Sequence, residues 1–182
     1  MPKKKNTPAL RFAGFSGEWE EKELLDIAPL QRGFDLPKSK MIDGKYPVVM
    51  SNGINGYHST FKAKAPGVVT GRSGTIGNLH YIESDYWPHN TALWVTDFKD
   101  NEPLYIYYMF QKMDLHRFGT GSGVPTLNRN DIHDTKTSIP NRDEQKRISS
   151  FFSQLDKLIN LQQREIGKLQ NIKKALLGKM FV

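Results

Sequence analysis

The 182-residue sequence contains no cysteine, which excludes disulfide bonds and thiolate metal sites. No apolar run approaches the 18 residues of a membrane-spanning helix, and no apolar stretch follows the N-terminal MPKKKNTPAL as a secretory signal requires. The five histidines show neither H-x-x-x-H nor H-E-x-x-H spacing. From these absences we expect a cytoplasmic protein with no membrane span, no metal site and no bound cofactor.

Motifs for nucleotide binding and for catalysis are also missing. The stretch GVVTGRSGTIGNLHYI, residues 67–82, has three evenly spaced glycines, but it matches neither G-x-G-x-x-G before a helix nor G-x-x-x-x-G-K-[ST]. The alternation in NLHYI indicates a strand, so this stretch predicts strand, tight glycine turn and strand. Methyltransferase (N-P-P-Y), helicase and nuclease motifs are absent too, and we therefore expect a non-catalytic chain.

Positive charge is present but unevenly distributed. The formal net charge is +7, and the segment 31–72 holds seven basic residues against two acidic ones. Acidic residues collect instead at 18–26 and 83–102. A contact with nucleic acid through one side of the molecule requires such a polarity. The alternative is a solvated surface that happens to be basic.

The local patterns divide the chain into three parts. Residues 1–12 are expected to form a flexible basic tail, residues 13–140 a domain, and residues 141–182 a long helix. Within the domain the patterns predict a short helix at 22–28, a helix at 103–115, and strands at 46–50, 67–70, 79–82, 91–95 and 135–140. Segments rich in glycine, proline or polar residues are expected as loops: 31–45, 51–64, 71–78 and 117–130.

The C-terminal helix carries an apolar seam. Asn141 is expected to cap it, with Glu144 reaching back as in a capping box. About 38 helical residues make a rod roughly 57 Å long, which is too long to be covered by its own domain, so we expect a partner helix. The alternative is a helix folded back on its own domain. Seam positions recur at spacings of four and three: Ile148, Phe152, Leu155, Ile159, Gln162, Ile166, Leu169, Lys173, Leu176 and Met180, widened by Phe151, Leu158 and Ile172.

Four segments carry a family resemblance: LRFAGFSGEWEEKELLDIA, GRSGTIGNLHYIESDYWPHNTALWV, GSGVPTLNRNDIHDTKTSIPNRDEQKRI and LQNIKKALLGKMF. In this order they resemble the DNA specificity (S) subunits of type I restriction–modification enzymes. An S subunit of this family usually contains two target recognition domains, each followed by a long helix. The two helices pack antiparallel as a spacer, each domain reads one half of a split DNA site, and the subunit carries methyltransferase (M) and endonuclease–translocase (R) subunits.

This chain has one such domain and one helix, so it resembles half of an S subunit. The resemblance implies an α+β fold, in which a mixed β-sheet target recognition domain is followed by a helix that forms an antiparallel coiled coil. It further implies a homodimer that binds double-stranded DNA together with M and R subunits. Ile148, Phe152, Leu155, Ile159, Gln162, Ile166, Leu169 and Leu176 are then the dimer residues, and two Gln162 side chains meet at the axis if the pair is centred there.

The resemblance also assigns the loops a role as the DNA-contacting face. Basic side chains supply phosphate contacts, and Arg, Asn and Ser side chains supply contacts to base edges. Two other interpretations remain open from the residues alone: a stand-alone DNA-binding regulator, and a coiled-coil adaptor that binds no DNA. The candidate DNA-binding residues are Arg32, Lys38, Lys40, Lys62, Lys64, Arg72, Ser73, Asn78, Arg117, Ser122 and Arg129.

Overall fold

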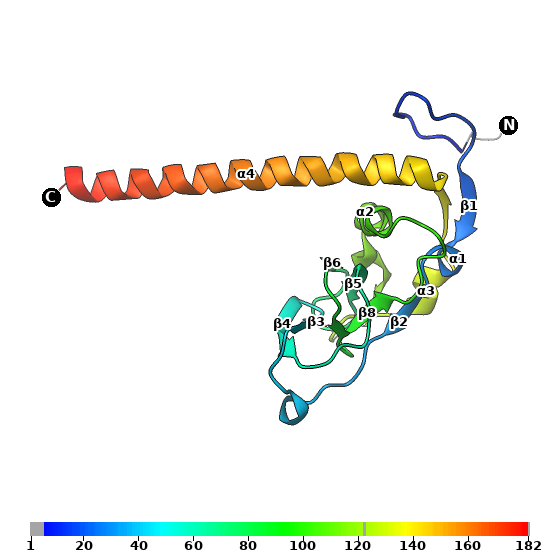
Figure 1. The fold of residues 1–182 in the computed structure, drawn as a ribbon, viewed down its shortest axis with the longest axis horizontal. Helices are drawn as coiled ribbons and strands as arrows, with labels where there is room; N and C mark the ends of the chain where they lie inside the picture. The colour runs from blue at the N-terminus through cyan, green and yellow to red at the C-terminus, as the bar shows by residue number, and fades with distance from the viewer. Residues whose placement is uncertain (1–5, 122, 182) are drawn as a thin grey trace.

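A helix of 39 residues, α4 (Arg142–Met180), projects as a straight rod from one corner of a small α+β domain (Figure 1). The computed structural model describes residues 6–121 and 123–181. The expected fold class, an α+β domain followed by one long helix, is confirmed. No helix in the described part of the chain combines the length and the apolar character needed to cross a membrane.

The domain is built around two small sheets. The first is antiparallel, in the order β2 (Leu30–Arg32), β8 (Ala92–Val95), β5 (Gly67–Gly71) and β6 (Leu79–Ile82). The second is mixed: β3 (Tyr46–Met50) pairs antiparallel with β4 (Gly53–His58) and parallel with β7 (Trp87–Pro88). Short elements complete the domain: η1 (Lys38–Lys40), η2 (Leu115–Phe118), β9 (Gly119–Thr120), β10 (Thr126–Leu127) and α3 (Arg129–His133).

The helix α2 (Pro103–Met113) covers the four-stranded sheet and supplies much of the core. It buries Tyr105, Ile106, Met109 and Phe110, whose spacing places them on one helical face. Pro103 occupies its first turn, where a missing N–H costs nothing, and the left-handed Asp114 ends it. The expected helix at 103–115 is therefore confirmed, with two residues fewer at its end.

The expected loops 31–45 and 117–130 contain short elements: the end of β2 and η1 in the first, and β9, β10 and the start of α3 in the second. Two further segments differ from the structure because of their partners. Residues 22 and 23 of the expected helix at 22–28 belong instead to β1 (Glu20–Glu23), which pairs with β11 (Lys136–Ile139), and only α1 (Leu24–Ile27) is helical. The expected loop 51–64 contains strand β4 because the edge of β3 offers it unpaired backbone groups. In both cases a partner distant in the sequence or outside the segment overrides the local pattern.

Polar side chains lock the start of α4 to the domain. The Asn141 side chain accepts a hydrogen bond from the Glu144 N–H at 3.0 Å, so the expected cap is confirmed. The capping box is wrong, because the buried Glu144 carboxylate faces Arg11 instead, at 2.7 and 2.8 Å. Gln145 donates to the Asn101 side chain and to the Pro140 carbonyl, and it accepts from the Glu102 N–H.

The N-terminal segment takes part in this joint. Arg11 also donates to the carbonyls of Ser16 and Gly17, and Phe12 packs edge-on against Phe151 of α4. Asn6 donates to the Trp19 carbonyl at 3.0 Å. Residues 6–12 are thus held by contacts and do not form the expected flexible tail, whereas residues 1–5 of that prediction lie outside the described residues.

Beyond Asp156, whose carboxylate accepts a hydrogen bond from the Tyr108 hydroxyl of α2, α4 stands clear of its own domain. Leu158, Ile159, Ile166, Leu169 and Ile172 are each more than half exposed. The helix therefore does not fold back on its own domain, which was the alternative left open by the sequence. A rod of 39 residues at 1.5 Å per residue is about 58 Å long.

We predict that Arg11→Ala lowers the free energy of unfolding by about 3 kcal/mol, because it leaves the Glu144 carboxylate, 1% exposed, without its charged partner. Chemical denaturation measures the change. Lys146→Ala is the matched control, since its pair with Asp143 is exposed and spans 3.8 Å, and it should change stability by about 0.5 kcal/mol at most. Equal effects of the two substitutions would contradict the assigned role of Arg11.

Candidate nucleic-acid interface

The glycine turn at 72–78 lies against two other segments of the domain. The Arg72 carbonyl accepts a hydrogen bond from the Leu127 N–H at 2.8 Å, and an isolated bridge joins Ser73 to Thr126. On another side, His80 Nε2 lies 3.4 Å from the Ser51 carbonyl oxygen. Three segments far apart in the sequence, near residues 51, 72 and 126, thus form one cluster.

The glycines allow the turn between β5 and β6 to fold tightly on itself. The Gly71 N–H donates to the Asn78 carbonyl and the Gly77 N–H donates to the Gly71 carbonyl, both at 2.9 Å. A Cβ atom on Gly71 would overlap the Thr75 carbonyl oxygen. Gly77 has φ +72°, and a Cβ there would lie 2.7 Å from the backbone nitrogen of His116. The predicted order of strand, glycine turn and strand is confirmed, and the glycines serve close backbone approach.

A second cluster gathers basic side chains around two aromatic rings. The Lys62 ammonium lies 5.2 Å from the centre of the Trp87 ring and 5.8 Å from that of Phe34, within cation–π range. His58 stacks on the same Trp87 ring, with centres 5.1 Å apart. Trp87 is 8% exposed and belongs to the core. The ring therefore offers a fixed surface to the ammonium of Lys62, a residue that remains exposed.

The segment 88–92 connects the two clusters, although it was not among the loops expected to contact DNA. The Thr91 carbonyl accepts from the Arg72 and Ser73 N–H groups, and its hydroxyl accepts from the Ser51 N–H. On the other side, the Phe34 N–H donates to the Pro88 carbonyl at 2.8 Å. The only sequence signal was a polar triplet, HNT, between two strands.

Two side chains of this segment face the second cluster. The Asn90 amide donates to the Asp35 carboxylate. Burial lowers the pKa of His89 below its usual value, and the Asp35 carboxylate opposes this shift. His89 is consequently neutral at pH 7, and its Nδ1 lies 3.1 Å from the Thr91 hydroxyl. The segment thus offers polar groups without adding charge.

Most of the candidate basic residues have no carboxylate partner among the described residues. The ion pairs of residues 6–121 and 123–181 include one candidate, Arg32, which lies 3.5 Å from Asp35 with both side chains more than half exposed. Such cationic groups are available to a polyanion. The remaining basic candidates are Lys38, Lys40, Lys62, Lys64, Arg72, Arg117 and Arg129, and all but the half-buried Arg72 are exposed.

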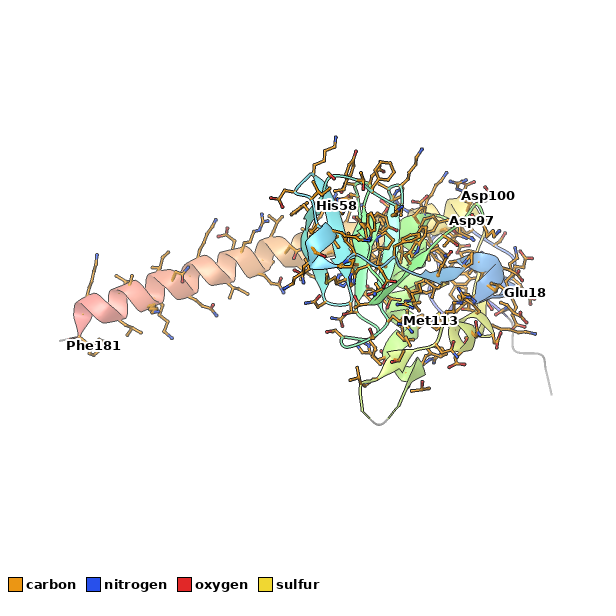
Figure 2. The ribbon with its side chains drawn as sticks, turned by 90° about the horizontal axis from the view of Figure 1, so that it is seen from below. Glu18, His58, Asp97, Asp100, Met113 and Phe181 are labelled. Atoms are coloured by element: carbon orange, nitrogen blue, oxygen red, sulfur yellow. The ribbon has the colours of Figure 1, made fainter. Side chains whose placement is uncertain are left out.

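Several acidic residues lie at another side of the domain. Figure 2 shows Glu18, Asp97 and Asp100 at the side of the domain away from His58. In Figure 1, β4 and η1 lie far from β1, the strand that carries three glutamates. The polarity of charge read from the sequence therefore corresponds to a separation in space.

The structure does not bring all candidates into one patch. Lys62 belongs to the second cluster, Arg32 lies beside Asp35, and Lys38 and Lys40 lie in η1, whereas Arg72, Ser73 and Asn78 belong to the glycine turn. Arg117 lies in η2 with its guanidinium over the Phe118 ring, and Arg129 begins α3, so neither is in a plain loop. Ser122 lies outside the described residues.

This arrangement suits binding better than chemistry. Its groups are ammonium, guanidinium, hydroxyl and amide donors, which match phosphate oxygens and the edges of bases. In the described part of the chain no three His, Asp or Glu side chains are grouped as metal ligands. The surface is therefore a candidate interface for a nucleic acid whose base sequence it could recognise.

Comparison with known proteins identifies the family. The model of the type I restriction modification DNA specificity domain matches residues 16–171. The chain belongs to this family. The specificity subunit of the type I restriction enzyme EcoprrI from Escherichia coli is 23% identical over 157 residues, which are 83% of this chain and 39% of that protein.

Solved structures share the fold of this specificity-domain chain. The S subunit of the type I restriction–modification system from M. genitalium aligns with a TM-score of 0.71 and 18% identity over 86% of this chain and 44% of its own. A chain from a study of assembly and conformational transition in a type I system aligns with a TM-score of 0.72 and 13% identity, covering 90% and 45%. The chain thus spans less than half the length of these relatives.

We predict that Gly71→Ala lowers the free energy of unfolding by about 2 kcal/mol, since the added methyl group overlaps the Thr75 carbonyl. Thermal or chemical denaturation measures this. Gly167→Ala in the exposed part of α4, where a Cβ has no neighbour within 4 Å, is the control. It should raise stability by about 0.5–1 kcal/mol, because alanine favours helix. A neutral Gly71→Ala would show that the turn tolerates a side chain.

Proposed function

We propose that this chain is the sequence-reading component of a type I restriction–modification system. In this proposal residues 13–140 form a target recognition domain that reads one half of a bipartite DNA site, and residues 141–182 form the spacer. The observation that carries the proposal is that Lys62 at the Trp87 ring and Arg72 at the glycine turn, in a domain of the DNA specificity family, have no carboxylate partner among the described residues.

The interface does not require catalysis by this chain. Its groups can position the protein on DNA and specify a base sequence. We therefore propose that methylation and cleavage are carried out by M and R partners, which the chain directs to the site in the cytoplasm. The structural relative studied for complex assembly in a type I system supports such a partnership.

Two copies of the chain would supply the two domains of a full-length subunit. The chain spans 39% of the E. coli relative and 44% of the M. genitalium S subunit. Its α4 seam is exposed over most of its length and requires a partner. We propose an antiparallel homodimer, which places identical domains at opposite ends and implies a target with inverted half-sites.

The DNA face is tested by separating phosphate contacts from base contacts. Lys62→Ala and Lys64→Ala should each weaken binding to all sequences alike and reduce the dependence of log K on log salt by about one. Arg72→Ala should instead change the preferred base at one position, at a cost of about 1–3 kcal/mol. Affinities over a salt series, and methylated motifs mapped in a host with an M subunit, provide the measurements.

The control for this test is Lys112→Ala, which removes an exposed lysine of α2 outside both clusters. It should leave affinity and salt dependence unchanged. If the triple substitution of Lys62, Lys64 and Arg72 leaves DNA affinity intact, the proposed face is misplaced.

The orientation of the dimer is tested by cross-linking, which the absence of natural cysteine makes clean. Chains with Ile148→Cys and chains with Leu176→Cys are mixed and treated with a short bifunctional maleimide. An antiparallel pair brings these positions to the same end, whereas a parallel pair separates them by roughly 42 Å at 1.5 Å per residue. Bridges between like positions, or a monomer by light scattering at micromolar concentration, would refute the arrangement.

A further inference from the structure

A groove of about 1290 Å³ opens where α4 crosses the domain. One wall comes from α2, with Tyr108, Met109 and Met113, a second from α4, with Ile148, Phe152 and Asp156, and further parts from residues 6–8, β1 and β11. Ile148 and Phe152 also belong to the apolar seam of α4. The groove is therefore continuous with the seam, and whatever covers the seam at this end also reaches the groove.

The seam fixes how two copies of α4 can match. From Ile148 to Met180 its spacings are 4, 3, 4, 3, 4, 3, 4, 3 and 4, and the series is the same when read backwards. In an antiparallel pair all ten positions therefore coincide when Ile148 is level with the partner's Met180. Phe152 then faces the partner's Leu176, and the axis lies level with Arg164 instead of Gln162.

Shifts of one heptad lose contacts at the ends. A shift in one direction places the partner's Leu176 level with Gln145, which is 2% exposed inside its own domain. A shift in the other direction leaves Ile148 and Phe152 facing beyond the end of α4 at Met180. Only the full match covers both ends of the seam.

The last turn of α4, together with Phe181 that follows it, is apolar over a wider arc than the seam. Leu176, Leu177, Met180 and Phe181 are each 49–75% exposed. A partner helix covers the seam positions Leu176 and Met180, whereas Leu177 and Phe181 lie to one side of the seam. The groove lies on the corresponding side of the seam, since Asp156, one residue beyond the seam position Leu155, lines it.

We infer that the groove between α2 and α4 receives the last turn of α4 from a second copy of this chain, in the register that sets Ile148 level with the partner's Met180. This inference rests on the antiparallel pairing proposed above and adds its register and its contact with the domain. Leu177 and Phe181 fill the groove against Met109 and Met113.

The register also gives the polar seam residue Lys173 a partner. The partner's Lys173 lies level with Leu155, and its ammonium reaches the flank that carries Asp156. The Asp156 carboxylate is held there by the Tyr108 hydroxyl at 2.6 Å. Other charged groups around the groove are Glu21, Lys112 and Lys136. An isolated lysine in the seam thus becomes half of an ion pair that selects one register.

The register is tested by charge reversal in the full chain, with the dimer dissociation constant measured by sedimentation equilibrium without DNA. Asp156→Lys and Lys173→Glu should each raise the constant about tenfold or more, because two symmetric pairs turn repulsive. The double variant should return to within about threefold of the native value. Tyr108→Phe is the control for loss of the hydrogen bond to Asp156. Failure of the double variant to recover overturns the register.

The groove is tested by Leu177→Asp against Leu161→Asp. Both leucines are about half exposed in one chain, at 49% and 54%, and both lie outside the seam, so neither change disturbs the fold of its own domain. Leu177→Asp should weaken the dimer at least about a hundredfold by placing a charge in an apolar groove in both copies, whereas Leu161→Asp should change it less than about threefold.

Equal effects of the two substitutions, or a native chain that is monomeric, overturn the inference. Because the readout is free of DNA, its failure is distinct from failure of DNA recognition: a dimer in another register still leaves the salt and sequence dependence of binding to be measured.

Discussion

The buried joint at the start of α4 is the constraint on which the geometry of the molecule depends. Arg11 closes over the Glu144 carboxylate, and Gln145 is bonded to three groups of the domain. These contacts fix the direction in which a rod of about 58 Å leaves the domain. An error of a few degrees at this point is multiplied along the rod, so in the proposed dimer the distance between the two domains depends on the polar contacts of this joint.

The proposed DNA face obeys a different rule, since its loops are joined through backbone groups. The Thr91 carbonyl and hydroxyl hold the segments near Arg72 and Ser51 together. Backbone bonds are indifferent to the side chains that the loops carry. A surface of this kind allows loop side chains, and with them the sequence that is read, to change while the scaffold remains.

Because the chain has one domain and one helix, the symmetry of the proposed dimer determines the symmetry of the proposed target. The E. coli and M. genitalium relatives are each about twice as long as this chain. Two copies of this chain present the same loops twice, so the proposed target must repeat one half-site in inverted orientation. The seam of α4, which reads the same in both directions, suits pairing with its own copy.

Local periodicity in the sequence was sufficient for the elements that depend on their own residues. The strands at 46–50 and 67–71, the helix at 103–113, the long α4 and its Asn141 cap follow from spacing and capping chemistry within each segment. The counts of charged residues along the chain likewise indicated that basic and acidic residues concentrate in different segments.

The features that depend on partners distant in the chain were decided by the tertiary structure alone. Strand β1 exists because β11 lies beside it, and Glu144 turns from its own helix cap to Arg11, 133 residues away. Thr91 joins Ser51 and Arg72 by hydrogen bonds, and these two residues lie in separate loops of the sequence. No local pattern encodes these contacts, because their free energy is available only after the chain has closed the loops between them.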